Sequence, residues 1–306
     1  MKNRGWTCLV WTSSNLAPAP EDLREPFVGI CGAERDWLCH VPANPGDWVV
    51  VDSYGATDAD VRALRSAAPE VRVLVIDDEA TRELAGAHVA LNSRLGLERS
   101  PYAAATRALL GEKYALLRPA LGQPGRVSFS LSSKLLPVLV MMGGTDPRGW
   151  TADVLHALAD VDAQRFAPVV VRARNSVGDE AVARALARFS GSVWVEGLNA
   201  AALAGWAGVC RYAVTACGGA LYEFALLGLP FVGVVVAPNQ RPLAMEVARR
   251  WRMPIVDAEE EVRPRVAAAL QQLLAEQPSS GASPRPPIGG IDGRGAARVA
   301  DVLETF

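Results

Sequence analysis

The chain has 306 residues, of which 31 are basic and 33 acidic, so its formal net charge is −2. No run of lysines and arginines favours nucleic acid or an anionic membrane, and no apolar run is long enough for a membrane span. The expected partner is therefore a small molecule. Five cysteines without a CxxC pair predict neither a metal site nor a disulfide framework, which fits a cytoplasmic protein.

Short β-branched runs alternate with helical patterns in the first half, which is typical of parallel βαβ units. A helix is predicted over 57–67, with Thr57 as its N-cap. Strands are predicted at 6–11, 47–54, 71–78, 88–92 and 113–117. We expect these elements to form a first domain over 1–118.

Residues 119–134 are rich in Pro, Gly and Ser, and we expect them to be a linker. The second half repeats the alternation, with strands predicted at 135–142, 167–174, 192–196, 211–215 and 231–236. Helices are predicted at 151–160, 179–189, 199–207 and 220–227. A second domain is expected over 135–280, followed at 281–306 by a flexible stretch and a closing helix. The fold class is α/β, with two doubly wound parallel sheets.

Two glycine pairs follow predicted strands, where open α/β sheets bind their ligands. Gly143 and Gly144 lead through Thr145 and Asp146 toward a helix, and the segment TACGGALYE (215–223) contains the second pair. Backbone N–H groups at such turns favour a phosphate. The alternative is plain turn geometry, because glycine tolerates a positive φ.

Three other groups have both a functional and a structural interpretation. Cys217 could be a nucleophile partnered by a histidine (His40, His88 or His156), but a buried packing role is favoured. Asp153 and His156 share a predicted helix without further metal ligands, so we interpret His156 as structural. Asp77 and Asp78 end a strand, where they either contact substrate hydroxyls or cap a turn.

Seven short segments together resemble one protein family. They occur in the order VVVDSYG (49–55), VIDDE (75–79), GEKYALLR (111–118), MMGGTDP (141–147), GGALYEFALLGLP (218–230), NQ (239–240) and IDGRGAARV (291–299). The set is similar to the UDP-2,4-diacetamido-2,4,6-trideoxy-β-L-altropyranose hydrolases of pseudaminic acid biosynthesis, whose relatives include spore-coat polysaccharide proteins. The resemblance spans nearly the whole chain.

The resemblance implies a GT-B (glycosyltransferase B) fold, with the cleft between two Rossmann-like domains and UDP held mainly by the second. The implied activity is release of UDP from a UDP-linked deoxy-diacetamido sugar, by attack of water at the anomeric carbon. No cofactor is implied. A GT-B glycosyltransferase, or a UDP-sugar-binding homologue with impaired catalysis, remains an alternative.

The resemblance also implies roles for individual residues. Gly218 and Gly219 match the turn that faces the diphosphate, and Glu223 matches the glutamate that accepts hydrogen bonds from the ribose hydroxyls. Tyr54 falls on a tyrosine that the family uses in catalysis. The remaining residues expected near the substrate are Asp52, Asp78, Asn239 and Gln240.

One part of the family pattern has no counterpart in this sequence. The family begins with a strand, a G-x-G-H-x-x-R loop and a helix, and the loop supplies the histidine that activates water. The present chain contains no GxGH, and its segment WTCLVW (6–11) corresponds to the family's second strand. A mis-assigned start codon, a binding-only homologue or a relocated catalytic residue would each account for this difference.

Overall fold

The computed structural model describes residues 44–98, 101–102, 105, 107–127, 132, 134–144, 146–174, 176–259, 261–276 and 285–306. The described residues form two compact units, one made of 44–114 with 294–306 and the other of 115–293. The described residues of the expected linker thus group with the second unit, and the closing helix groups with the first. The strand predicted at 6–11 lies outside the described residues.

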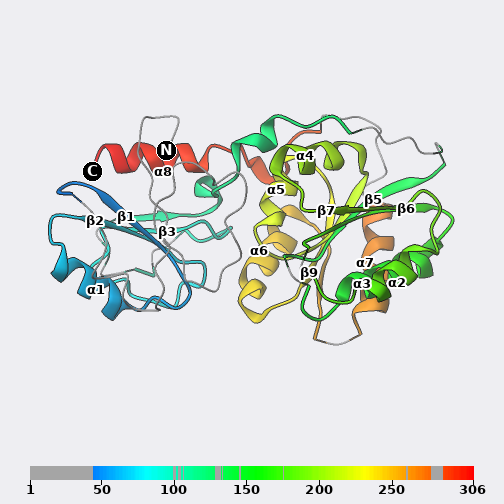
Figure 1. Ribbon diagram of the computed structural model, residues 1–306, viewed down its shortest axis with the longest axis horizontal. Helices are drawn as coiled ribbons and strands as arrows, with labels where there is room; N and C mark the ends of the chain where they lie inside the picture. Colours follow the sequence, from blue (N-terminus) through cyan, green and yellow to red (C-terminus); the bar gives the residue numbers. More distant parts are fainter. Residues whose placement is uncertain are drawn as a thin grey trace. The chain divides into compact units, whose positions relative to one another are not determined.

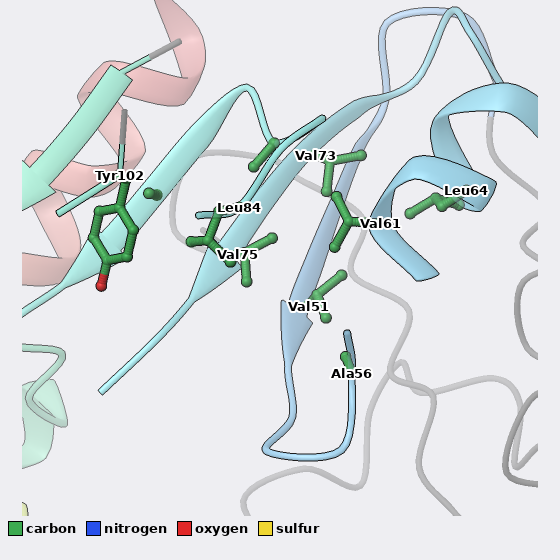
Figure 2. Close-up of a cluster of buried hydrophobic side chains, with 10 residues drawn as sticks. Val51, Ala56, Val61, Leu64, Val73, Val75, Leu84 and Tyr102 are labelled. Atoms are coloured by element: carbon green, nitrogen blue, oxygen red, sulfur yellow. The ribbon is translucent and has the colours of Figure 1, made fainter. Parts of the chain in front are cut away.

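The first unit contains a parallel sheet of four described strands in the order β1-β2-β3-β4. These strands are β1 (Trp48–Asp52), β2 (Arg72–Ile76), β3 (Val89–Asn92) and β4 (Arg107–Leu110). Helix α1 (Asp58–Ala67) begins at the predicted N-cap, Thr57, which forms a capping box with Asp60. Valines and leucines of β1, β2 and α1 pack together on one side of the sheet, as Figure 2 shows.

The prediction of a strand at 113–117 is wrong. The fourth strand instead ends at Leu110, before Gly111, whose φ of +86° is left-handed and turns the chain out of the sheet. A 3-10 helix, η4 (Glu112–Tyr114), follows it. The apolar run after Gly111 therefore forms no strand.

The predicted closing helix is present as α8 (Gly295–Glu304), and it completes the core of the first unit. Its side chains Val299, Val302 and Leu303 pack with buried leucine and valine side chains of β2, β3 and β4. The Trp48 indole also donates a hydrogen bond of 3.1 Å to the carbonyl oxygen of Leu303. The C-terminal segment is thus a structural part of the unit that begins far earlier in the sequence.

The second unit is a six-stranded parallel sheet with helices on both faces (Figure 1). Its strands are β5 (Leu136–Met141), β6 (Phe166–Arg172), β7 (Val193–Glu196), β8 (Tyr212–Ala216), β9 (Phe231–Val235) and β10 (Ile255–Asp257). Its α-helices are α2 (Trp150–Asp162), α3 (Asp179–Leu186), α4 (Ala200–Val209), α5 (Ala220–Leu226), α6 (Arg241–Trp251) and α7 (Val262–Glu276). Of these elements, α6, β10 and α7 were not predicted individually.

The order of the strands, β10-β9-β8-β5-β6-β7, identifies the second unit as doubly wound. The chain builds outward from β5 through β6 to β7, then returns to the other side of β5 with β8, β9 and β10. The order reverses between β5 and β8, which pair from Val138↔Tyr212 to Met141↔Thr215. In open α/β sheets, ligands bind beyond the carboxyl ends of the strands at such a reversal.

Candidate functional site

Both glycine turns lie at the point where the strand order of the second unit reverses. The first follows β5 and the second follows β8, and the Thr215 hydroxyl ties the two strand ends together by donating 2.8 Å to the Met141 carbonyl. Between the turns lies a cavity of about 250 Å³. Its lining consists of Met142, Gly143, Gly144, Asp146, Pro147, Thr215, Ala216, Gly218, Gly219, Ala220, Val236 and Gln240. Thr145 lies outside the described residues.

Three of the four glycines have no conformational or steric need to be glycine. Gly143 has a φ of +89°, which accounts for it as a turn residue. Gly144, Gly218 and Gly219 do not have a positive φ, and a Cβ atom added at any of them would have no described atom within 4 Å. Plain turn geometry therefore explains Gly143 alone. The other three leave the backbone open to close approach from the cavity.

Asp146 is a buried residue of the first turn whose carboxylate binds the start of α2. Its backbone φ is +43°, unusual for a residue other than glycine, and the residue is only 2% exposed. Its carboxylate accepts hydrogen bonds from the Trp150 amide (2.9 Å), the Thr151 amide (3.0 Å) and the Thr151 hydroxyl (2.6 Å). The guanidinium of Arg172, equally buried, pairs with it at 3.1 Å. Asp146, which we predict to contact substrate, lines the cavity, and its carboxylate is engaged by Trp150, Thr151 and Arg172.

Gln240 and Asn239, expected as a pair, occupy different environments. The Gln240 side-chain oxygen accepts a hydrogen bond of 2.9 Å from the Val236 amide, so the side-chain NH₂ group remains a donor at the cavity lining. Asn239 is exposed and is not among the residues that line the cavity. The structure therefore brings only Gln240 to the glycine turns.

Glu223 lies on α5, four residues after Gly219. Its Oε1 accepts hydrogen bonds from Arg118, at 3.2 Å from Nε and 2.9 Å from Nη2. This ion pair could not be predicted from the sequence, because 105 residues separate the partners. Arg118 is the last residue of the GEKYALLR segment and of the predicted first domain.

In the first unit, three predicted residues (Asp52, Tyr54 and Asp78) lie at or just after the carboxyl ends of β1 and β2, which are aligned by the pairing Asp52↔Ile76. The Tyr54 hydroxyl donates a hydrogen bond of 3.3 Å to Asp78. Partial burial raises the pKa of Tyr54, and the negative charge of Asp78 raises it further. The phenol is therefore protonated at neutral pH and acts as a donor. Asp52 is exposed at the end of β1.

The pKa of Asp78 is also raised, mainly by partial burial and further by neighbouring acidic residues, although the hydrogen bond from Tyr54 lowers it. The preceding residue, Asp77, is instead buried and structural. Its carboxylate accepts hydrogen bonds from Tyr102 Oη at 2.8 Å and from the Ala80 amide at 3.1 Å. Of the two adjacent aspartates, only Asp78 is open to a substrate.

The nucleophile and metal alternatives have little support among the described residues. Cys217 is fully buried, and burial raises the pKa of its thiol to about 12, so it is not a thiolate at neutral pH. His88 accepts a hydrogen bond from the Val73 amide, and His156 lies 3.2 Å from Arg188. His40 lies outside the described residues. Within the described ranges, no group of three potential metal ligands occurs.

A second hollow, of about 470 Å³, was not anticipated from the sequence. It lies where α2 and α7 begin, and Arg148 covers the Trp150 ring there at 5.1 Å. Three acidic side chains (Asp153, Glu259 and Glu261) and one further basic side chain (Arg263) contribute to the rest of its lining. Its lining could not be predicted because β10 and α7 were not individually predicted.

Comparison with known proteins identifies the fold. No protein-family model and no curated protein matches the chain. Among solved structures, UDP-GlcNAc 2-epimerase from Neisseria meningitidis, bound to UDP-GlcNAc, is similar with a TM-score of 0.55 and 14% identity, over 86% of this chain and 77% of that one. MurG from Acinetobacter baumannii is similar with a TM-score of 0.52 and 15% identity, over 85% and 75%.

A third similar structure is MnaA from S. aureus in complex with UDP, with a TM-score of 0.54 and 15% identity, over 84% of this chain and 73% of that one. At these identities the similarity establishes the fold alone. The chain is an α/β protein with two parallel sheets and a GT-B-like fold, as expected from the sequence. No helix within the described ranges has the length and apolar character needed to cross a membrane.

Proposed function

We propose that the second unit binds the UDP moiety of a nucleotide sugar at the cavity between the two glycine turns. The observation that carries this proposal is the set Gly144, Gly218 and Gly219, which are open toward solvent without a conformational or packing reason to be glycine. The cavity lies at the strand-order reversal, where doubly wound sheets bind ligands. Two proteins of similar fold were solved with UDP or UDP-GlcNAc bound.

The diphosphate is the part of UDP that suits this cavity best. Backbone N–H groups in a turn attract anionic oxygens, and a nearby side-chain amide can add a further hydrogen bond. The Gly218 amide already donates 2.9 Å to the Ala216 carbonyl, so Gly144 and Gly219 are the amides that we propose face the diphosphate. Gln240 has its oxygen occupied by the Val236 amide and offers its NH₂ group as that donor. The Asp146 carboxylate forms an ion pair with Arg172. This ion pair compensates a negative charge that would otherwise repel a phosphate at the turn.

The reaction that we propose is hydrolysis of the bond between the anomeric carbon and the UDP phosphate oxygen. Water forms the new bond to the anomeric carbon, and UDP leaves with the electron pair of the broken bond. In the first unit, Asp78 is the candidate acceptor for the proton that water loses, because its raised pKa makes it a stronger base than an ordinary aspartate. Tyr54 is its hydrogen-bond donor.

The resemblance of the seven sequence segments favours UDP-2,4-diacetamido-2,4,6-trideoxy-β-L-altropyranose as the substrate. A UDP-sugar-binding homologue without turnover is the second candidate. One observation favours it: both described histidines, His88 and His156, interact with neighbouring protein groups and are not positioned as open bases. Both candidates require UDP binding, and only the hydrolase requires release of UDP from the sugar.

Thermal unfolding with and without UDP tests the shared part of the proposal. A ligand at a hundredfold excess over its Kd stabilises the native protein by about 2.7 kcal/mol, so we expect saturating UDP to raise Tm by about 5–10 °C. UMP, which has one phosphate fewer, should protect less. An unchanged Tm with UDP would contradict the proposal. Measuring UDP release from the UDP-sugar then separates hydrolase from binding protein.

A further inference from the structure

Glu223 is an ionisable residue on an otherwise apolar helix. Its side chain is 15% exposed, while its helix neighbours Leu221 and Phe224 are fully buried. A carboxylate in such a place is unfavourable unless it is paired and hydrogen-bonded. Glu223 and Gly219 are four residues apart, so Glu223 lies on the same face as a glycine that lines the cavity.

The ion pair with Arg118 uses only one of the two carboxylate oxygens. Nε and Nη2 of Arg118 both donate to Oε1, at 3.2 and 2.9 Å. Among the described residues, none is recorded in a hydrogen bond with Oε2. The carboxylate is thus fixed on one side while its second oxygen retains its capacity to accept.

The position of Arg118 follows from its surroundings in the sequence. The next residue is Pro119, which disfavours helical backbone at Arg118, and Arg118 is extended with φ −69° and ψ 124°. The following 3-10 helix, η5 (Pro119–Gly122), buries Leu121. The Gly125 amide then donates a hydrogen bond of 2.7 Å to Ala201 in α4. These contacts hold Arg118 on the same unit as Glu223.

We propose that Arg118 is a positioning residue that orients Glu223 so that Oε2 accepts the ribose hydroxyls of a uridine nucleotide. Arg118 would thereby set the preference for ribose over sugars without those hydroxyls. This inference rests on the proposed binding of UDP by the second unit. Stability alone is a weak reason for the pair, because Arg118 is 44% exposed and exposed ion pairs contribute little.

The test is calorimetric titration of UDP and of 2′,3′-dideoxy-UDP into the full chain and its variants. We expect wild type to prefer UDP, and Arg118→Met to weaken UDP binding by about tenfold while changing dideoxy-UDP binding by less than about twofold. Glu223→Gln should have the same pattern, and the double variant should lose no more than Glu223→Gln alone. Arg126→Met removes an exposed arginine of the same unit and should retain the preference for UDP.

Arg118→Lys keeps the positive charge but cannot donate from two nitrogens, so it should lose part of the preference for UDP over dideoxy-UDP. Thermal unfolding of each variant verifies that it is folded. An unchanged preference in Arg118→Met, or equal losses for both ligands, would overturn the positioning role. Failure of wild type to bind UDP would instead refute the proposed function itself.

Discussion

Asp78 is the residue whose charge and position most directly suggest function in the first unit. Its pKa is raised from 3.8, so the folded protein holds this proton more tightly than the unfolded chain does. Ionisation of Asp78 therefore lowers the free energy of unfolding at neutral pH. This loss disappears below pH 3.8, the pKa of the carboxyl group in the unfolded chain. A residue that costs stability at a strand end is a candidate for a functional role.

We therefore predict that Asp78→Asn raises Tm slightly at pH 7, and that its advantage over wild type shrinks as the pH falls toward 3.8. In a hydrolase, the same substitution should lower turnover by about 10²–10⁴-fold, the usual cost of losing a general base. Thermal unfolding at pH 7 and pH 4, with a turnover assay, measures both effects. Glu83→Gln, an exposed control in the same unit, should change neither.

A lower Tm for Asp78→Asn at pH 7 would mean that the carboxylate stabilises the fold, contrary to this account. The glycine pairs and Asp78 are predictable as candidate residues because they follow strands in the sequence. The ion pair of Asp146 was not predictable, because its partner Arg172 lies 26 residues away on β6. The Arg118–Glu223 pair was equally inaccessible, since only the fold brings these residues together.

Helix α8 contributes buried side chains to the core of the first unit. Leu303 is 1% exposed and packs in the same cluster as buried side chains of β2, β3 and β4. We predict that Leu303→Ala destabilises the first unit by about 2–5 kcal/mol, as large-to-small substitutions in a core usually do. Chemical denaturation of wild type and variant, followed by circular dichroism, measures this loss.

Ala297→Ser, on the exposed side of α8, is the control and should change stability by at most about 0.5 kcal/mol. Equal stability of Leu303→Ala and wild type would contradict the packing of α8 in this core. UDP binding by the second unit should be retained in the Leu303 variant, since the substitution lies in the other unit.

Most elements were predictable because buried parallel strands appear as short β-branched runs. The strand prediction at 113–117 was wrong although this segment is also apolar. The positive φ at Gly111 ends β4 before the segment begins. Helix α7 carries buried residues at helical spacing, Val262, Val266, Ala269, Leu270 and Leu273, so its pattern could have been recognised. The strand order that brings the glycine turns together is not encoded in any single segment.

For the whole molecule, the proposed function depends on whether the second unit binds UDP at the glycine turns. The fold is that of proteins that include UDP complexes, and the cavity lies where a doubly wound sheet binds its ligand. Fold similarity alone does not carry function, since one fold hosts many activities. The glycines that face the cavity are the part of the account that a substitution can test.

The most direct measurement is calorimetric titration of UDP into wild type, Gly219→Ala and Gly122→Ala. Neither glycine has a positive φ, and an added Cβ would have no described atom within 4 Å at either position, so both variants should fold normally. Gly219 lines the cavity, whereas Gly122 does not. We predict that Gly219→Ala weakens UDP binding by about tenfold or more, because its methyl group obstructs close approach of the phosphates to the backbone. Gly122→Ala should bind as wild type does, and wild-type affinity in Gly219→Ala would contradict the proposed site.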